Sequence, residues 1–142
     1  MKKNLVTIAV ILMFALTIFS GCTEQQSTKT NTNNGVPLGS LDMFSVDSTG
    51  GQFSVLQNTV EVNVYEGSVS EPVNITVESI ANPASDSSQA MLSCYEFGPE
   101  GLTFERPIDV NLHYNLDDIP QGVEETALKV YVLNGNSWEP IG

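Results

Sequence analysis

Side chains that commonly catalyse reactions or bind metals are scarce in this chain. Its 142 residues include two cysteines and one histidine, which are Cys22, Cys94 and His113. A structural zinc site uses four cysteine or histidine ligands, and a thiol nucleophile needs a neighbouring histidine and an orienting group. No motif of either kind surrounds these residues, so we predict no catalytic residue, no metal site and no cofactor. Cys94 is expected to be a small core residue, or to form a disulfide with Cys22.

Carboxylates are the abundant reactive groups. Acidic residues number 17 against 5 basic ones, which gives a formal net charge of −12. The pairs Asp117-Asp118 and Glu124-Glu125 lie in one connection. They are either solvated surface charge or the working groups of a carbohydrate-active or hydrolase-accessory protein. A nucleic-acid partner is excluded, because binding phosphates requires clustered lysine and arginine.

Residues 1–21 have the pattern of a secretory signal peptide. Two lysines precede fifteen uncharged, mostly apolar residues at 5–19, a run shorter than the about 20 residues of a membrane-spanning helix. Residues 20–22, Ser-Gly-Cys, resemble the lipobox of prokaryotic lipoproteins, although Phe19 stands where leucine is usual. The resemblance implies that Cys22 carries lipid and anchors the protein at the extracytoplasmic side of the cell membrane. The other interpretation is an uncleaved N-terminal anchor.

The segment 22–40 is predicted to be a lipidated cysteine and a flexible tether. Threonine, asparagine, glutamine and serine make up 11 of the 18 residues at 23–40. Such a tract buries too little apolar surface to offset its ordering entropy. The alternative is a loop that folds against the domain. We expect the folded domain to span 41–142.

Strict alternation of apolar and polar residues runs through 41–142, clearest at 60–65, 73–78, 108–114 and 128–133. A period of two places one set of side chains toward a core and the other toward water, which indicates β-strands. Asn134-Gly135 predicts a tight hairpin, and the one helical turn is expected within 122–127. The expected core residues include Val62, Ile75, Val110 and Val130, and the expected exposed residues include Glu61, Asp109 and Lys129.

Three stretches resemble the ZU-type β-sandwich family of zonula occludens proteins, ankyrins, netrin receptors and many prokaryotic surface proteins. The most specific is 95–110, where Gly-Pro-Glu-Gly at 98–101 precedes Phe104 and Pro107. Residues 64–77 resemble the family's earlier turn and strand, and 128–138 its late hairpin ending in tryptophan. The resemblance implies an all-β protein with one antiparallel β-sandwich domain that acts as a binding or structural module without catalysis.

The family usually has another strand after the tryptophan hairpin, often with a His-Phe-Ser motif near its end. This chain stops soon after Trp138 and contains no His-Phe-Ser. We therefore expect the sandwich to lack its last strand, and its open edge to take up another copy or another surface protein by strand addition. Residues 41–46 are strand-like and are the alternative occupant of that edge.

Two further surface features are candidates. Asn74-Ile75-Thr76 is a sequon, so Asn74 is a candidate glycosylation site. Tyr65, Tyr131 and Trp138 lie opposite the main apolar sets or at strand ends. They form either a binding surface or a second layer of the core.

Overall fold

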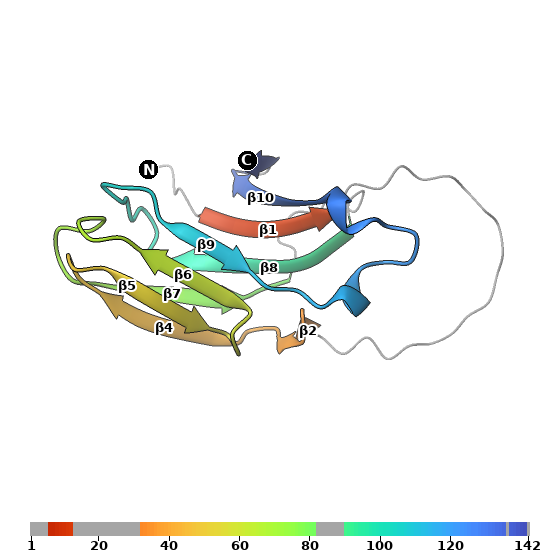
Figure 1. Cartoon of the computed structure of the whole chain (residues 1–142), viewed down its shortest axis with the longest axis horizontal. Coiled ribbons are helices and arrows are strands. Elements are labelled where there is room, and N and C mark those ends of the chain that lie inside the picture. Colours follow the sequence, from red (N-terminus) through yellow and green to blue (C-terminus); the bar gives the residue numbers. More distant parts are fainter. Residues whose placement is uncertain (1–5, 13–31, 82–89, 136, 142) are drawn as a thin grey trace.

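The computed structural model describes residues 6–12, 32–81, 90–135 and 137–141 of the chain. These residues form antiparallel strands with two short 3₁₀ turns, so the predicted all-β class is confirmed (Figure 1). The strands are β1 (Val6–Leu12), β2 (Thr32–Asn33), β3 (Val36–Pro37), β4 (Leu41–Val46), β5 (Gly51–Val55), β6 (Val60–Val64), β7 (Val73–Ser79), β8 (Ala90–Gly98), β9 (Asp109–Leu112), β10 (Leu128–Asn134) and β11 (Ser137–Ile141). The turns are η1 (Leu116–Asp118) and η2 (Glu125–Ala127).

The strands form two main sheets and one short hairpin. The large sheet has the order β11-β10-β1-β8-β7-β4, the small sheet has the order β5-β6-β9, and β2 pairs with β3. Figure 1 shows the small sheet lying over the large one. The predicted hairpin joins β10 to β11, with Gly135 at a φ of 63°. The predicted helical turn is η2, within the expected range.

The main core lies between β4, β7 and β8 of the large sheet and the small sheet. Buried positions alternate along β6 and β7, because successive side chains of a strand point to opposite faces. Val62 and Ile75 are buried as expected, and Glu61, Asp109 and Lys129 are exposed. The buried residues of this cluster are Val36, Phe44, Val46, Val55, Leu56, Val60, Val62, Val64, Val69, Ile75, Val77 and Tyr95.

Val110 and Val130, which were expected to be buried core residues, are less buried than expected. Both are half-buried, although Val110 packs against the main core. β9 is an edge strand of the small sheet, and β10 is separated from β8 by β1. The small sheet therefore covers this end of the large sheet incompletely.

A second, smaller cluster contains Cys94 and Tyr131, with Ile80, Met91 and Trp138 packed against it. Cys94 neighbours Tyr95 along β8, and Tyr95 belongs to the main core. Because neighbouring residues of a strand face opposite ways, the second cluster lies on the other face of the large sheet.

The folded region begins earlier than the predicted boundary at residue 41. Val36 is 1% exposed and belongs to the main core. The Asn34 side chain donates from Nδ2 to the backbone oxygen of His113 and accepts from the backbone N–H of Asn115 at 2.9 Å. Residues 32–40 therefore fold against the domain, which was the alternative to a free tether. The rest of the predicted tether, 22–31, lies outside the described residues.

The structure also places part of the predicted signal peptide in the large sheet. β1 pairs antiparallel with β10 on one side and with β8 on the other. Cys22 lies outside the described residues, so its lipidation stays a prediction. In the described part of the chain, no helix has both the length and the apolar character needed to cross a bilayer.

Candidate interaction site at the Gly98–Phe104 loop

The loop that follows β8 contains the Gly-Pro-Glu-Gly sequence. A cis peptide joins Gly98 to Pro99, and the backbone N–H of Leu102 donates to the oxygen of Pro99 at 3.3 Å. Gly101 has a φ of 80°, which favours glycine because a side chain is strained there. At Gly98 an added Cβ would lie 2.4 Å from Oγ1 of Thr76. Glycine at this position therefore permits β8 to pack closely on β7.

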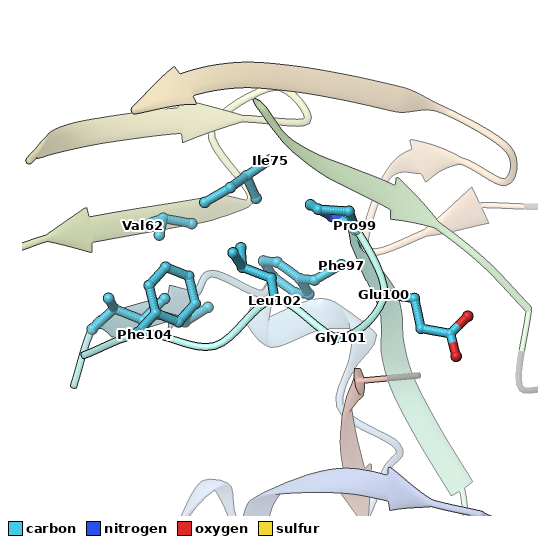
Figure 2. Close-up of a pocket in the computed structure, with 11 residues that line it drawn as sticks. Val62, Ile75, Phe97, Pro99, Glu100, Gly101, Leu102 and Phe104 are labelled. Atoms are coloured by element: carbon cyan, nitrogen blue, oxygen red, sulfur yellow. The ribbon is translucent and has the colours of Figure 1, made fainter. Parts of the chain in front are cut away.

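Under this loop lies an apolar cavity of about 100 Å³, open at the end of the sandwich (Figure 2). A cavity of about 150 Å³ lined by aliphatic and aromatic groups accepts benzene, so this one fits a small aliphatic side chain. The loop residues 98–101 form its rim. Its apolar walls are Val62, Ile75, Phe97, Leu102, Phe104, Ile108 and Val110.

The segment that follows the rim and the cavity wall is attached to the rest of the domain by hydrogen bonds. Arg106 Nη1 donates to the backbone oxygen of Glu66 at 2.9 Å, and the N–H of Glu105 donates to the oxygen of Ser68 at 2.9 Å. Figure 2 shows the carboxylate of Glu100 pointing away from the cavity. The site thus combines an apolar interior with a negative charge beside its mouth, which is the chemistry of a contact surface for a protein side chain.

Outward-facing polar pairs occupy the small sheet and the connection after it. The Tyr65 hydroxyl donates to the Asp109 carboxylate, and this hydrogen bond and the negative charge raise the pKa of Tyr65. His113 Nε2 lies 3.3 Å from Glu61 Oε2. Because its pKa is raised, the Tyr65 hydroxyl keeps its proton, so the Tyr65–Asp109 pair does not supply a phenolate nucleophile.

The acidic pairs between β9 and β10 act as local hydrogen-bond acceptors. Tyr114 donates from its hydroxyl to Glu125 Oε1 at 2.6 Å, and this bond raises the pKa of Tyr114. Asn115 donates from Nδ2 to Asp118 Oδ2 at 3.3 Å. Across residues 6–12, 32–81, 90–135 and 137–141, no three histidine, cysteine or acidic side chains are grouped so that they could hold a metal ion.

The structure does not bring the three predicted surface aromatics together. Tyr65 is 45% exposed and follows β6. Tyr131 is 4% exposed, and Trp138 packs against it. The interpretation of Tyr131 as a binding residue is wrong, and the alternative of a second core layer applies to Tyr131 and Trp138. The register places Tyr131 on the face that also carries Cys94, which the alternation within β10 did not reveal.

The remaining candidates are Asn74 and Cys94. Asn74 is exposed on β7, opposite Ser45 of β4. Its side chain is therefore accessible, and its glycosylation stays a prediction. Cys94 is buried, and burial, followed by the charge of Glu96, raises the pKa of its thiol to about 12. A thiol held protonated in this way is a weak nucleophile.

Sequence reasoning did not find the cavity or the contacts of Asn34. The sequence feature that could have indicated the cavity is the group of apolar residues around Gly-Pro-Glu-Gly, from Phe97 to Phe104. A second hollow that it missed lies between β9 and β10. It has a volume of about 370 Å³, and its apolar lining includes Val110, Leu112, Leu128 and Val130.

Comparison with known proteins gives the class to which this geometry belongs. The model of the ZU5 domain family matches residues 42–129, more than half of the chain. The protein therefore belongs to the ZU5 domain family, as the Gly98–Pro107 motif had indicated, and this family suggests a protein-interaction module. No curated protein and no solved structure matches the chain.

Proposed function

We propose that this protein is an extracytoplasmic lipoprotein, held at the cell membrane by lipid on Cys22, whose ZU5 domain binds another protein and catalyses no reaction. The observation that carries the proposal is the match of residues 42–129 to an interaction-domain family. The signal-like residues 1–21 and the lipobox-like 20–22 support the anchor. A lipid is needed for it, because an acidic domain is repelled by an anionic membrane surface.

The cavity under the Gly98–Phe104 loop is the proposed contact point for the partner. Its walls are apolar, and burying an aliphatic group stabilises a complex by about 0.8 kcal/mol per methylene. One inserted valine or leucine would therefore supply about 2 kcal/mol, the size of an interface hot spot. The partner's side chain would enter beside Glu100, so a neighbouring basic residue on the partner would increase the association rate.

Strand addition is a second way in which this domain can bind a protein. β9 is paired with β6 on one side only, and the hollow beside it is lined with apolar residues. A strand added along β9, from another copy or from another surface protein, would cover that hollow. We expect weak, concentration-dependent association in sedimentation of the processed protein. A strict monomer at high concentration would contradict self-association by this route.

The anchor is tested by mass spectrometry of the native protein. We expect a mature N-terminus at lipidated Cys22, and expect Cys22→Ser to leave the precursor uncleaved or to release the domain from the membrane. An intact Met1 leader or an unmodified Cys22 thiol would refute the anchor.

Binding is tested by capturing partners of the intact lipoprotein from a membrane fraction. Leu102→Asp puts a charge in the cavity wall, and we expect it to lose the captured partner while its melting temperature shows that it still folds. Leu116→Asp is the matched control, because Leu116 is an apolar residue that is 65% exposed on η1, away from the cavity. Equal capture by both variants would refute the cavity as the contact point.

A further inference from the structure

β1 occupies an internal position in the large sheet. Its residues pair with β10 from Thr7↔Leu133 to Leu12↔Leu128, and with β8 from Val6↔Phe97 to Leu12↔Ala90. Figure 1 shows β1 between β10 and β8. It is thus the strand that joins β10 and β11 to β8, β7 and β4.

This strand belongs to the segment that a signal peptidase would remove. β1 spans residues 6–12, whereas the mature lipoprotein would begin at Cys22. Removal leaves a gap one strand wide, about 10 Å between β8 and β10, because paired strands lie about 4.8 Å apart. The backbone N–H and C=O groups that face the gap on both strands then have no ladder partner.

We propose that the mature protein has a strand slot between β8 and β10, and that the slot binds an extended apolar segment of a different protein, antiparallel to both neighbours. The inference rests on the proposed function, because it requires cleavage before Cys22. In the precursor the leader fills the slot, so processing also controls when the slot becomes available.

The chemistry of the occupant follows from the strand that fills the slot in the structure. Its sequence, Val-Thr-Ile-Ala-Val-Ile-Leu, has no charge, and five of its seven residues are β-branched. An internal strand whose neighbours have buried residues on both faces of the sheet favours such an apolar, β-branched run. The residues of β8 and β10 beside the slot also favour an apolar occupant. On one face they include buried Tyr95 and half-buried Val130. Buried Cys94 and Tyr131 lie beside the slot on the other face.

Among the described residues that follow the cleavage point, each strand already has a partner strand. β4 to β11 are already paired with other strands in the described part of the chain, and β2 and β3 have two residues each. Residues 23–31 are polar throughout, which is unfavourable for a site buried on two faces. A second mature copy lacks the same leader strand. The proposed occupant is a segment of another protein.

The probe for the test is a synthetic peptide of residues 6–12 with lysines added at both ends for solubility. We titrate it into the native processed lipoprotein in detergent and measure binding by fluorescence anisotropy and stability by melting temperature. We expect saturable one-to-one binding and a higher melting temperature, since a ligand that binds only the folded state stabilises it.

The matched control is the same peptide with Ala9→Pro. Ala9 pairs with both Tyr131 and Cys94 at the centre of the strand, and proline removes an N–H from the ladder. We expect its affinity to fall at least tenfold. Equal affinity of the two peptides would show nonspecific apolar adsorption and would refute the slot.

Hydrogen exchange gives the second measurement. In the processed protein we expect the amides of 90–98 and 128–134 to exchange faster than after peptide addition. Full protection without peptide would mean that the sheet closes by itself, and would refute the slot. A protected dimer that excludes the peptide would also refute it, because the occupant would then be a second copy.

Failure of this inference is distinguishable from failure of the proposed function. A native N-terminus at lipidated Cys22 without peptide binding refutes the slot and leaves the anchored interaction module intact. An intact leader in the native protein refutes the processing on which both depend, and β1 is then a permanent strand of the sheet.

Discussion

Removing one hydroxyl group from the main core should stabilise this protein. Tyr95 on β8 is 0% exposed, and its hydroxyl has no hydrogen-bond partner among the residues that the structure describes. A buried polar group without a partner costs about 1–3 kcal/mol in lost hydration. Tyr95→Phe removes that cost and keeps the ring that fills the core.

The size of the effect follows from two opposing contributions. The variant no longer has the desolvation cost of the buried hydroxyl, which is worth about 1–3 kcal/mol. It loses a few tenths of a kcal/mol to the oxygen-sized void, at about 24 cal/mol per Å³ of cavity. We therefore expect the free energy of unfolding to rise by about 0.7–2.7 kcal/mol.

Urea unfolding measures this change, with an unchanged slope showing that the surface exposed on unfolding is the same. Tyr114→Phe is the matched control, because the Tyr114 hydroxyl donates to Glu125 at 2.6 Å on the surface. Its removal should lower stability only slightly, because this hydrogen bond is exposed to water. A loss of more than about 1 kcal/mol in Tyr95→Phe would show that its hydroxyl is satisfied, and would refute the reasoning.

Three further predictions concern the core, a turn and a thiol. Val62→Asp should unfold the domain, because Val62 is buried and an unpaired charge there has no compensating partner; a native circular dichroism spectrum would show that the register of β6 is wrong. Gly50→Ala should lower the melting temperature more than Gly101→Ala, because both glycines have positive φ but only at Gly50 would the new Cβ lie 2.2 Å from a backbone oxygen; equal losses would contradict the close approach. Burial raises the pKa of Cys94 from 9.0 to about 12, so the folded state keeps a proton that the unfolded state releases above pH 9. This thiol should not affect the free energy of unfolding below pH 9, and should lower it by about 1.4 kcal/mol per pH unit between the two pKa values. Cys94→Ala should remove that part of the decline. An identical pH profile for the variant would contradict the burial of the thiol.

The sequence alone was sufficient for the clearest strands within 41–142 and for the centre of the core. Alternation placed Val62 and Ile75 inside and Glu61 outside, and the structure confirms these positions. The same local pattern predicted the β10–β11 hairpin. The Gly98–Pro107 motif indicated the family that the comparison shows. These features are local, because a period of two and a turn residue act within a few positions of the chain.

The sequence could not decide which faces the other layer would cover. Alternation in β10 separated Tyr131 from Val130 correctly, but the buried residue is Tyr131, because a second cluster forms on the far face of the large sheet. In the same way, Val36 and Asn34 lie in a polar tract, and only contacts with distant residues such as His113 make it part of the domain.

The cavity and the place of β1 also depend on the tertiary structure. The cavity takes its walls from four strands and a loop that are far apart in the chain, so no short stretch of sequence contains it. The apolar run at 5–19 is suited equally to a signal peptide and to a strand buried on both faces. The composition of this run determines that it favours an apolar environment. Its place in the sheet depends on hydrogen bonds with the backbones of β8 and β10, which lie far away in the sequence.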